Sequence, residues 1–172
     1  MYLNDFYIDY KSSSNGVVLY GLYDPVHWFD VSRKRCFLSN SIRISIINDC
    51  LTLPSSFQGM PVVGIADFWM MGGNPYQLGE KIGVKHLVIP ASYRKLGSKN
   101  FSCWKNLEKV TLHCDKYAMD DYTFAYCDNL VKVECMNSSI YSFCKSLPVK
   151  SLGLGHGCFD RCLDHIDFVC VG

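Results

Sequence analysis

Two consecutive stretches of the chain carry the same pattern of apolar and polar positions. Residues 86–110 read HLVIPASYRKLGSKNFSCWKNLEKV, and residues 109–133 read KVTLHCDKYAMDDYTFAYCDNLVKV. With an offset of 23 residues, apolar side chains coincide at six positions: Leu87/Val110, Ile89/Leu112, Leu96/Met119, Phe101/Phe124, Leu107/Leu130 and Val110/Val133. Self-similarity at a fixed period of about 20 to 50 residues is typical of repeat proteins, in which each unit buries its apolar face against its neighbours. The pattern therefore predicts a repeat architecture.

The apolar positions within one repeat predict its local structure. Residues 87–89 are short, β-branched and alternating, which favours one strand per repeat. Pro90 ends that strand because proline has no N–H to donate. Phe101, Trp104 and Leu107 are spaced by three, which indicates a short helical or 3₁₀ segment with one inward face. We expect each repeat to be a coil of strand, turn and short helical segment.

These residues resemble the BspA-like leucine-rich repeats, which have a period of about 23 residues. Three segments match in order, and the resemblance covers about residues 51–165. The matching residues are Gly59, Pro61, Val62, Ile65 and Phe68 in the first segment, Ile89, Pro90, Ser92, Leu96, Gly97 and Phe101 in the second, and Phe124, Cys127 and Leu130 in the third. The resemblance implies a short right-handed α/β solenoid. It also implies a recognition or adhesion module, since most family members act in this way.

The same register predicts the domain organisation. We expect residues 1–50 to form an N-terminal β cap, with strands at 17–23 and 42–47 and a hairpin turn at 14–16. Residues 51–172 would form about five coils, the first at 51–68. The spacing of 33 residues from Phe68 to Phe101 indicates a loop insertion at 69–81. After residue 135 the phenylalanines at 143 and 159 shorten the apparent period, which predicts a degenerate C-terminal coil.

Composition and charge exclude several classes of protein. The 172 residues are 49% hydrophobic and 19% charged, with a formal net charge of +1, so the chain can form a core and has no overall bias toward nucleic acid. No apolar run is long enough to cross a membrane. The N-terminus lacks the basic and apolar regions of a secretory signal. We therefore expect a cytoplasmic protein; the alternative is a secreted or surface protein whose signal has been removed.

The ten cysteines favour buried thiols over a disulfide framework or a metal site. Without a secretory signal, a reducing compartment is expected, and free cysteine behaves as a small buried hydrophobe. The best zinc candidates are Cys158, Cys162, His165 and Cys170, but their spacing is wider than that of known zinc sites. We expect core thiols, no metal and no other cofactor.

The sequence contains no recognised catalytic motif. Its five histidines are scattered, and it has neither a G-x-S-x-G nucleophile motif nor a phosphate-binding or dinucleotide-binding glycine-rich loop. We expect a protein that is not an enzyme and has no small-molecule substrate.

Charge is concentrated in one repeat. Residues 81–109 contain seven lysines and arginines against one acidic residue, while the next repeat is acidic. The basic residues, with two neighbouring aromatic side chains, are the predicted partner-binding set: Lys81, Lys85, Tyr93, Arg94, Lys95, Lys99 and Trp69. The alternative is a solvated outer face that keeps the protein soluble. Opposite charges on adjacent coils could also pair with each other or support self-association.

These observations predict a non-catalytic module that binds a protein partner, which could be part of a nucleoprotein complex. One alternative is a small intracellular inhibitor, encoded by a mobile element, that blocks a nucleic-acid enzyme such as a CRISPR nuclease. Another is a surface adhesion module that lacks its signal.

Overall fold

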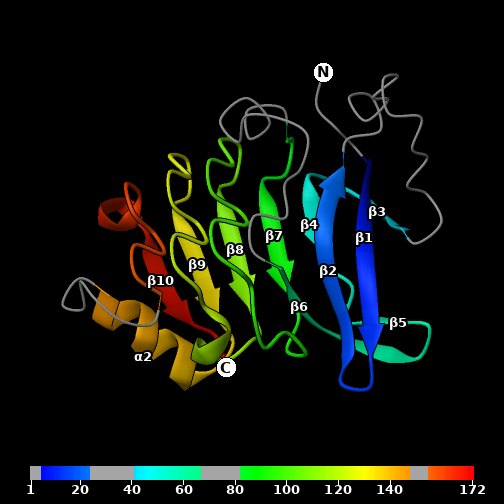
Figure 1. Ribbon diagram of the computed structural model, residues 1–172. Helices are drawn as coiled ribbons and strands as arrows, with labels where there is room; N and C mark the ends of the chain where they lie inside the picture. Colours follow the sequence, from blue (N-terminus) through cyan, green and yellow to red (C-terminus); the bar gives the residue numbers. More distant parts are fainter. Residues whose placement is uncertain (1–4, 24–40, 67–81, 148–154) are drawn as a thin grey trace.

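The computed structural model describes residues 5–23, 41–66, 82–147 and 155–172 (Figure 1). Their strands form two five-stranded sheets, with the orders β3-β1-β2-β6-β5 and β10-β9-β8-β7-β4. The predicted loop insertion at 69–81 lies outside these ranges.

The first sheet begins with the predicted hairpin. β1 (Asp5–Ser13) and β2 (Gly16–Tyr23) are antiparallel and pair up to Ser13 and Gly16, which confirms the turn. Gly16 has φ +128°, and a Cβ there would lie 2.6 Å from the carbonyl oxygen of Pro61, so this position requires glycine. β3 (Ser41–Ser45) pairs with the other side of β1.

The second sheet is parallel throughout. Its strands are β4 (Cys50–Thr52), β7 (His86–Ile89), β8 (Lys109–Leu112), β9 (Lys132–Cys135) and β10 (Asp167–Cys170). Leu87 pairs with Val110, and Val110 pairs with Val133, so the predicted alignment of the repeats is confirmed. We call the chain from one strand of this sheet to the next a coil.

Successive coils stack on one another through a column of phenylalanines. The rings of Phe101 and Phe124 are 5.3 Å apart, those of Phe124 and Phe159 are 5.4 Å apart, and all three side chains are buried. The N–H of Phe101 donates to the carbonyl of Thr123, and the N–H of Phe124 donates to that of Cys158. Hydrogen bonds thus join the coils on this side as well as through the sheet.

The predicted helical segment around Phe101 is wrong. The backbone there turns through left-handed residues at Lys99 (φ 59°) and Cys103 (φ 64°), and again at Tyr122 (φ 55°) and Tyr126 (φ 61°) in the next coil. Such turns bring side chains inward every three residues without a helix. The inward placement itself is confirmed, because Trp104, Leu107 and Leu130 are fully buried.

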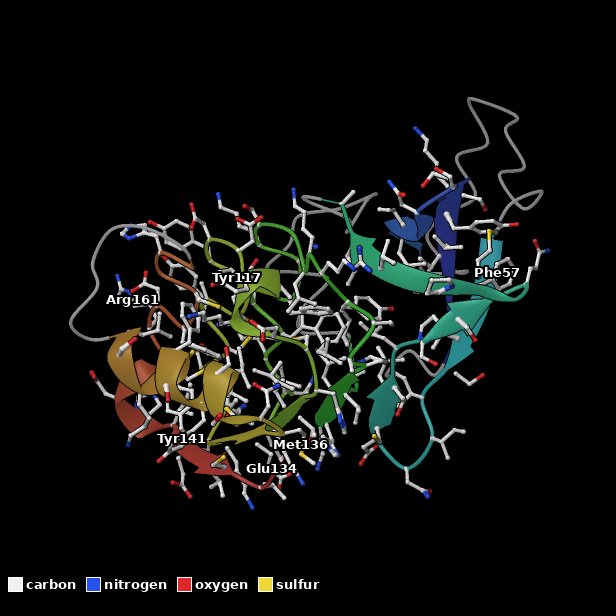
Figure 2. All side chains as sticks on the ribbon, turned by 90° about the horizontal axis from the view of Figure 1, so that it is seen from below. Phe57, Tyr117, Glu134, Met136, Tyr141 and Arg161 are labelled. Atoms are coloured by element: carbon white, nitrogen blue, oxygen red, sulfur yellow. The ribbon has the colours of Figure 1, made fainter. Side chains whose placement is uncertain are left out.

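The predicted shortening of the period after residue 135 is also wrong. Phe143 lies on α2 (Ser138–Ser146), and Phe159 is the residue that stacks on Phe124. Val133 pairs with Phe168, so this coil is longer than the two 23-residue coils before it, and it contains a helix. α2 packs against β9, β10 and the 3₁₀ helix η2 (Lys116–Ala118), which follows β8 (Figures 1 and 2). A second 3₁₀ helix, η4 (Leu163–His165), precedes β10.

The two sheets share one core. β5 (Ser56–Phe57) and β6 (Met60–Ile65) form a hairpin, and β6 also runs parallel to β2. The end of β6 also contacts the coil that follows β7, where the N–H of Ile65 donates to Lys95 O at 2.9 Å. A single cluster of buried side chains runs from Ile8 to Cys162. The predicted boundary at residue 50 coincides with the start of β4, but it does not separate two independent cores.

Candidate partner-binding face

The second sheet has one face that points away from the core. In β7 and β9, buried and half-buried residues alternate, so every second side chain lies on the outside. Glu134 is on this side (Figure 2). We call the outward positions of β7 to β10 the outer sheet face; the residues that define it are His86, Val88, Lys109, Thr111, Lys132, Glu134, Asp167 and Val169.

A hydrogen-bonded network crosses three strands of the outer sheet face. His86 Nε2 lies 2.8 Å from Thr111 Oγ1, and the Thr111 hydroxyl donates to Glu134 Oε2 at 3.2 Å. A carboxylate can only accept, so the single hydroxyl proton of Thr111 points to Glu134. Thr111 therefore accepts from His86, and Nε2 is the nitrogen of His86 that carries the proton.

Two lysines complete the network around Glu134. Lys109 Nζ is 2.9 Å and Lys132 Nζ is 3.2 Å from the carboxylate. The hydrogen bond from Lys109, with further help from Lys132, lowers the pKa of Glu134 to about 2. Burial and the charge of Lys109 lower the pKa of His86 more than Glu134 raises it. Glu134 is therefore held as the carboxylate and His86 as the neutral imidazole at neutral pH.

This arrangement offers fixed donors, acceptors and charges of both signs. Here the Thr111 hydroxyl donates to Glu134 and receives a hydrogen bond from His86. Both hydrogen-bonding roles of the Thr111 hydroxyl are thus used within the face.

Two of the predicted basic residues are paired with acids of the next coil. Lys85 lies 3.5 Å from Glu108, and Lys95 lies 3.9 Å from Asp120. Lys105, outside the predicted set, pairs with Asp128. The prediction that opposite charges pair across adjacent coils is confirmed.

Several residues of the predicted binding set do not gather on one surface. Lys85 precedes β7, while Arg94 lies beside β6, where its N–H donates to Val63 O. Lys99 is on a third part of the coil, with its ammonium 5.9 Å from the centre of the Tyr122 ring. The basic residues thus surround the coil. Trp69 and Lys81 lie outside the described residues.

The prediction that Tyr93 is a surface anchor is wrong. Its side chain is only 2% exposed, and its hydroxyl donates to the carbonyl oxygen of Pro54 at 3.0 Å. A partner could not reach this ring without unfolding the first coil. Tyr93 instead fixes the coil against the preceding segment.

The C-terminal cysteines lie in different environments. Cys158 and Cys162 are buried, and the thiol of Cys162 lies 3.2 Å from Phe159 O. Cys170 and His165 are exposed. Within the ranges that the structure describes, no three histidine, cysteine or acidic side chains converge as metal ligands would. Cys158 and Cys162 therefore lie in the core, which agrees with the expectation of buried thiols.

The sequence-based prediction did not include the residues of this network, because no one of them belongs to a recognisable motif. Their signal was the repeat itself: His86, Thr111 and Glu134 occupy outward strand positions of three successive repeats. Polar residues two positions apart in such strands must share one face of the sheet. Applying that rule to the aligned repeats would have brought them together.

Comparisons with known proteins do not assign this chain to a family. No family model matches it, and no curated protein matches it. One solved structure, described as the crystal structure of the T. pallidum leucine-rich repeat protein, is similar with a TM-score of 0.37 and 14% sequence identity. The similarity covers 95% of this chain and 80% of that one. In the described part of the chain, no helix is sufficiently long and apolar to span a membrane.

Proposed function

We propose that this chain is a non-catalytic protein-binding module, built as a short right-handed solenoid of the leucine-rich-repeat type. The main support for this proposal is the outer sheet face, where a network of hydrogen bonds and ion pairs holds the side chains in place. Side chains that are ordered before binding lose less conformational entropy when a partner arrives. The face is therefore suited to recognition.

The repeat supports the solenoid part of the proposal. The strands β7, β8 and β9 follow one another at intervals of 23 residues and pair in register. Coils that contact only their neighbours present an extended surface, which repeat proteins commonly use to bind other proteins.

The charges on the outer sheet face favour a protein partner over nucleic acid. Lys109 and Lys132 both engage Glu134, so their charge is partly neutralised within the face. An acidic neighbour weakens the attraction of a lysine for phosphate. The lysines whose segregation suggested an inhibitor of a nucleic-acid enzyme likewise pair with acids between coils. A protein surface of mixed charge is the complementary ligand.

We further propose that the protein acts in a reducing compartment such as the cytoplasm. The nine cysteines that the structure describes are free thiols, and seven of them are buried. Burial raises the pKa of the Cys162 thiol to about 12, which keeps it unreactive. An adhesion module outside the cell would more commonly rely on disulfides.

The experiment is an affinity capture from the cytosol of the native host, at low and high salt, with mass-spectrometric quantification. Three baits are compared: the wild type, Lys132→Glu on the outer sheet face, and Lys145→Glu as a matched charge reversal on α2. We expect a stoichiometric partner that the wild type and Lys145→Glu retain and Lys132→Glu loses. Equal capture by all three baits, or capture of no partner, would overturn the proposed face.

A further inference from the structure

Two cysteines from different elements meet beneath α2. Cys135 is the last residue of β9 and is buried, and Cys144 lies on the face of α2 that is buried together with Ile140 and Phe143. α2 packs against β9, and both cysteine side chains are fully buried. The two thiols are hydrogen-bonded to each other. A strand and a helix are therefore joined at this point by a contact between two thiols.

This contact distinguishes the pair from other thiols of the core. Cys127 and Cys162 donate to backbone carbonyl oxygens, at 3.1 Å and 3.2 Å. A thiol that faces a carbonyl has no partner with which to form a covalent bond. Two thiols in contact, by contrast, can lose their hydrogens and form a disulfide. In Cys135 and Cys144 this bond would link β9 directly to the third turn of α2.

The hydrogen bond also makes the two thiols chemically unequal. It lowers the pKa of Cys135 and raises that of Cys144, because the S–H of Cys144 stabilises the thiolate of Cys135. Burial raises the pKa of Cys114 and Cys162 to about 12. The thiolate is the form of cysteine that attacks an electrophile. Cys135 is therefore suited to react first, with Cys144 in place as the second thiol.

A small oxidant can reach the pair when α2 opens. The helix lies at the surface of the molecule, with Ser138, Ser142 and Lys145 exposed on the side away from the core (Figure 2). It has nine residues, and short peripheral elements open at a lower free energy than the whole fold unfolds. Hydrogen peroxide is close to water in size, so a brief opening is sufficient to admit it.

We propose that Cys135 and Cys144 are a redox-sensitive pair, which hydrogen peroxide converts into a disulfide that fixes α2 to β9. The Cys135 thiolate attacks one peroxide oxygen, the O–O bond breaks, and the leaving hydroxide takes up the proton that Cys135 released. This step gives a sulfenic acid and one water. The Cys144 thiol then attacks the sulfenic sulfur, the S–O bond breaks and a second water leaves. The two thiols lose two electrons, and one peroxide is reduced to two waters.

This proposal goes beyond the function proposed above, because the pair lies in the core and its chemistry does not depend on the outer sheet face. The sequence permits a direct test. Cleavage by trypsin after Lys132 and Lys145 gives a peptide, residues 133–145, that contains Cys135 and Cys144 and no other cysteine. The folded protein is treated with hydrogen peroxide, its remaining thiols are alkylated in denaturant, and this peptide is analysed by mass spectrometry.

We expect most of the peptide to lack two hydrogens and both alkyl groups, and dithiothreitol should reverse the change. Cys127 and Cys162 should remain available for alkylation, which shows that the protein stayed folded during the treatment. A peptide 133–145 that keeps both thiols while the exposed Cys170 is oxidised would overturn the proposal. So would a disulfide that joins other cysteines.

The melting temperature tests whether the bond fixes the helix. Peroxide should raise it by about 5 °C in the wild type, because the disulfide closes a loop in the unfolded chain. Cys135→Ala and Cys144→Ala should lose this rise, while Cys127→Ala, which removes another fully buried thiol, should keep it. An unchanged melting temperature of the oxidised wild type would overturn the proposal. If the alanine variants do not fold, the wild-type peptide and melting temperature decide the outcome.

Discussion

At the scale of single residues, Phe124 contributes most directly to the stacking of the coils. Its ring lies between those of Phe101 and Phe159 and is fully buried. We expect Phe124→Ala to lower the free energy of unfolding by about 3 to 5 kcal/mol, because the cavity would lie between coils that cannot easily close on it. Urea denaturation followed by circular dichroism measures this loss.

The control for Phe124 is Tyr117→Ala, which removes an aromatic ring that is 71% exposed. Its effect should stay within about 0.5 kcal/mol. A loss below about 1 kcal/mol for Phe124→Ala would contradict the stacking of the three rings.

Glu134 predicts how stability depends on pH. Its pKa is lowered to about 2 in the folded protein, from 4.5 for an ordinary glutamate. The unfolded chain therefore binds a proton more readily, and the stabilisation by Glu134 is present above pH 4.5 and is lost as the pH falls toward 2. The difference in unfolding free energy between the wild type and Glu134→Gln should shrink over that range. A difference that does not change between these pH values would show that Lys109 and Lys132 do not hold the carboxylate.

At the scale of elements, α2 depends on Asn137, the residue that precedes it. Asn137 caps the helix by accepting from the Ile140 N–H at 3.0 Å, and its amide donates to Cys114 O at 3.2 Å on the preceding coil. We expect Asn137→Ala to lower the free energy of unfolding by about 1 to 2 kcal/mol. Thermal or urea denaturation measures the change.

The matched variant is Asn137→Asp, which keeps the acceptor for Ile140 and removes the donor to Cys114. It should cost less than Asn137→Ala, because the cap remains. If both substitutions cost the same, the cap would contribute nothing and the predicted role of Asn137 would be wrong.

The elements also show how far the sequence predicts this fold. The strands at 86–89 and 109–112 were predictable because their apolar residues alternate and recur at a fixed offset. The left-handed turns were not, because lysine, cysteine and tyrosine occupy positions where glycine would have signalled a positive φ. α2 had a local signal in Ile140, Phe143 and Cys144, which lie on one helical face. The spacing of Phe143 from Phe124 suggested a repeat position instead, and the helix was therefore not predicted.

Placement of the binding residues required information from distant parts of the chain. The concentration of basic residues was visible in the sequence. Their positions around the coil, and the pairing of Lys85 and Lys95 with acids of the next coil, were not. Tyr93 was misplaced because its partner, Pro54, lies 39 residues earlier and leaves no trace in the local pattern. The outer sheet face could have been predicted from the sequence, because it follows from the register of the strands alone.

At the scale of the whole molecule, the cap and the coils form one folding unit. β6 pairs with β2 and is also hydrogen-bonded to Lys95 of the coil that follows β7, and the buried cluster is continuous from Ile8 to Cys162. Coils that contact only their neighbours should tolerate the addition of an equivalent coil, since the new unit repeats interfaces that already exist. The 23-residue repeat is thus the structural unit on which both the fold and the outer sheet face depend.

The most direct test is to insert a second copy of residues 109–131 after residue 131 and measure unfolding in urea. The added coil should stack between its neighbours, so the chain should unfold in one transition at higher free energy. The dependence of that free energy on urea should rise by about one-eighth, in proportion to the added length. An unchanged urea dependence with a protease-sensitive insert, or loss of the folded state, would contradict the 23-residue coil as the unit of this structure.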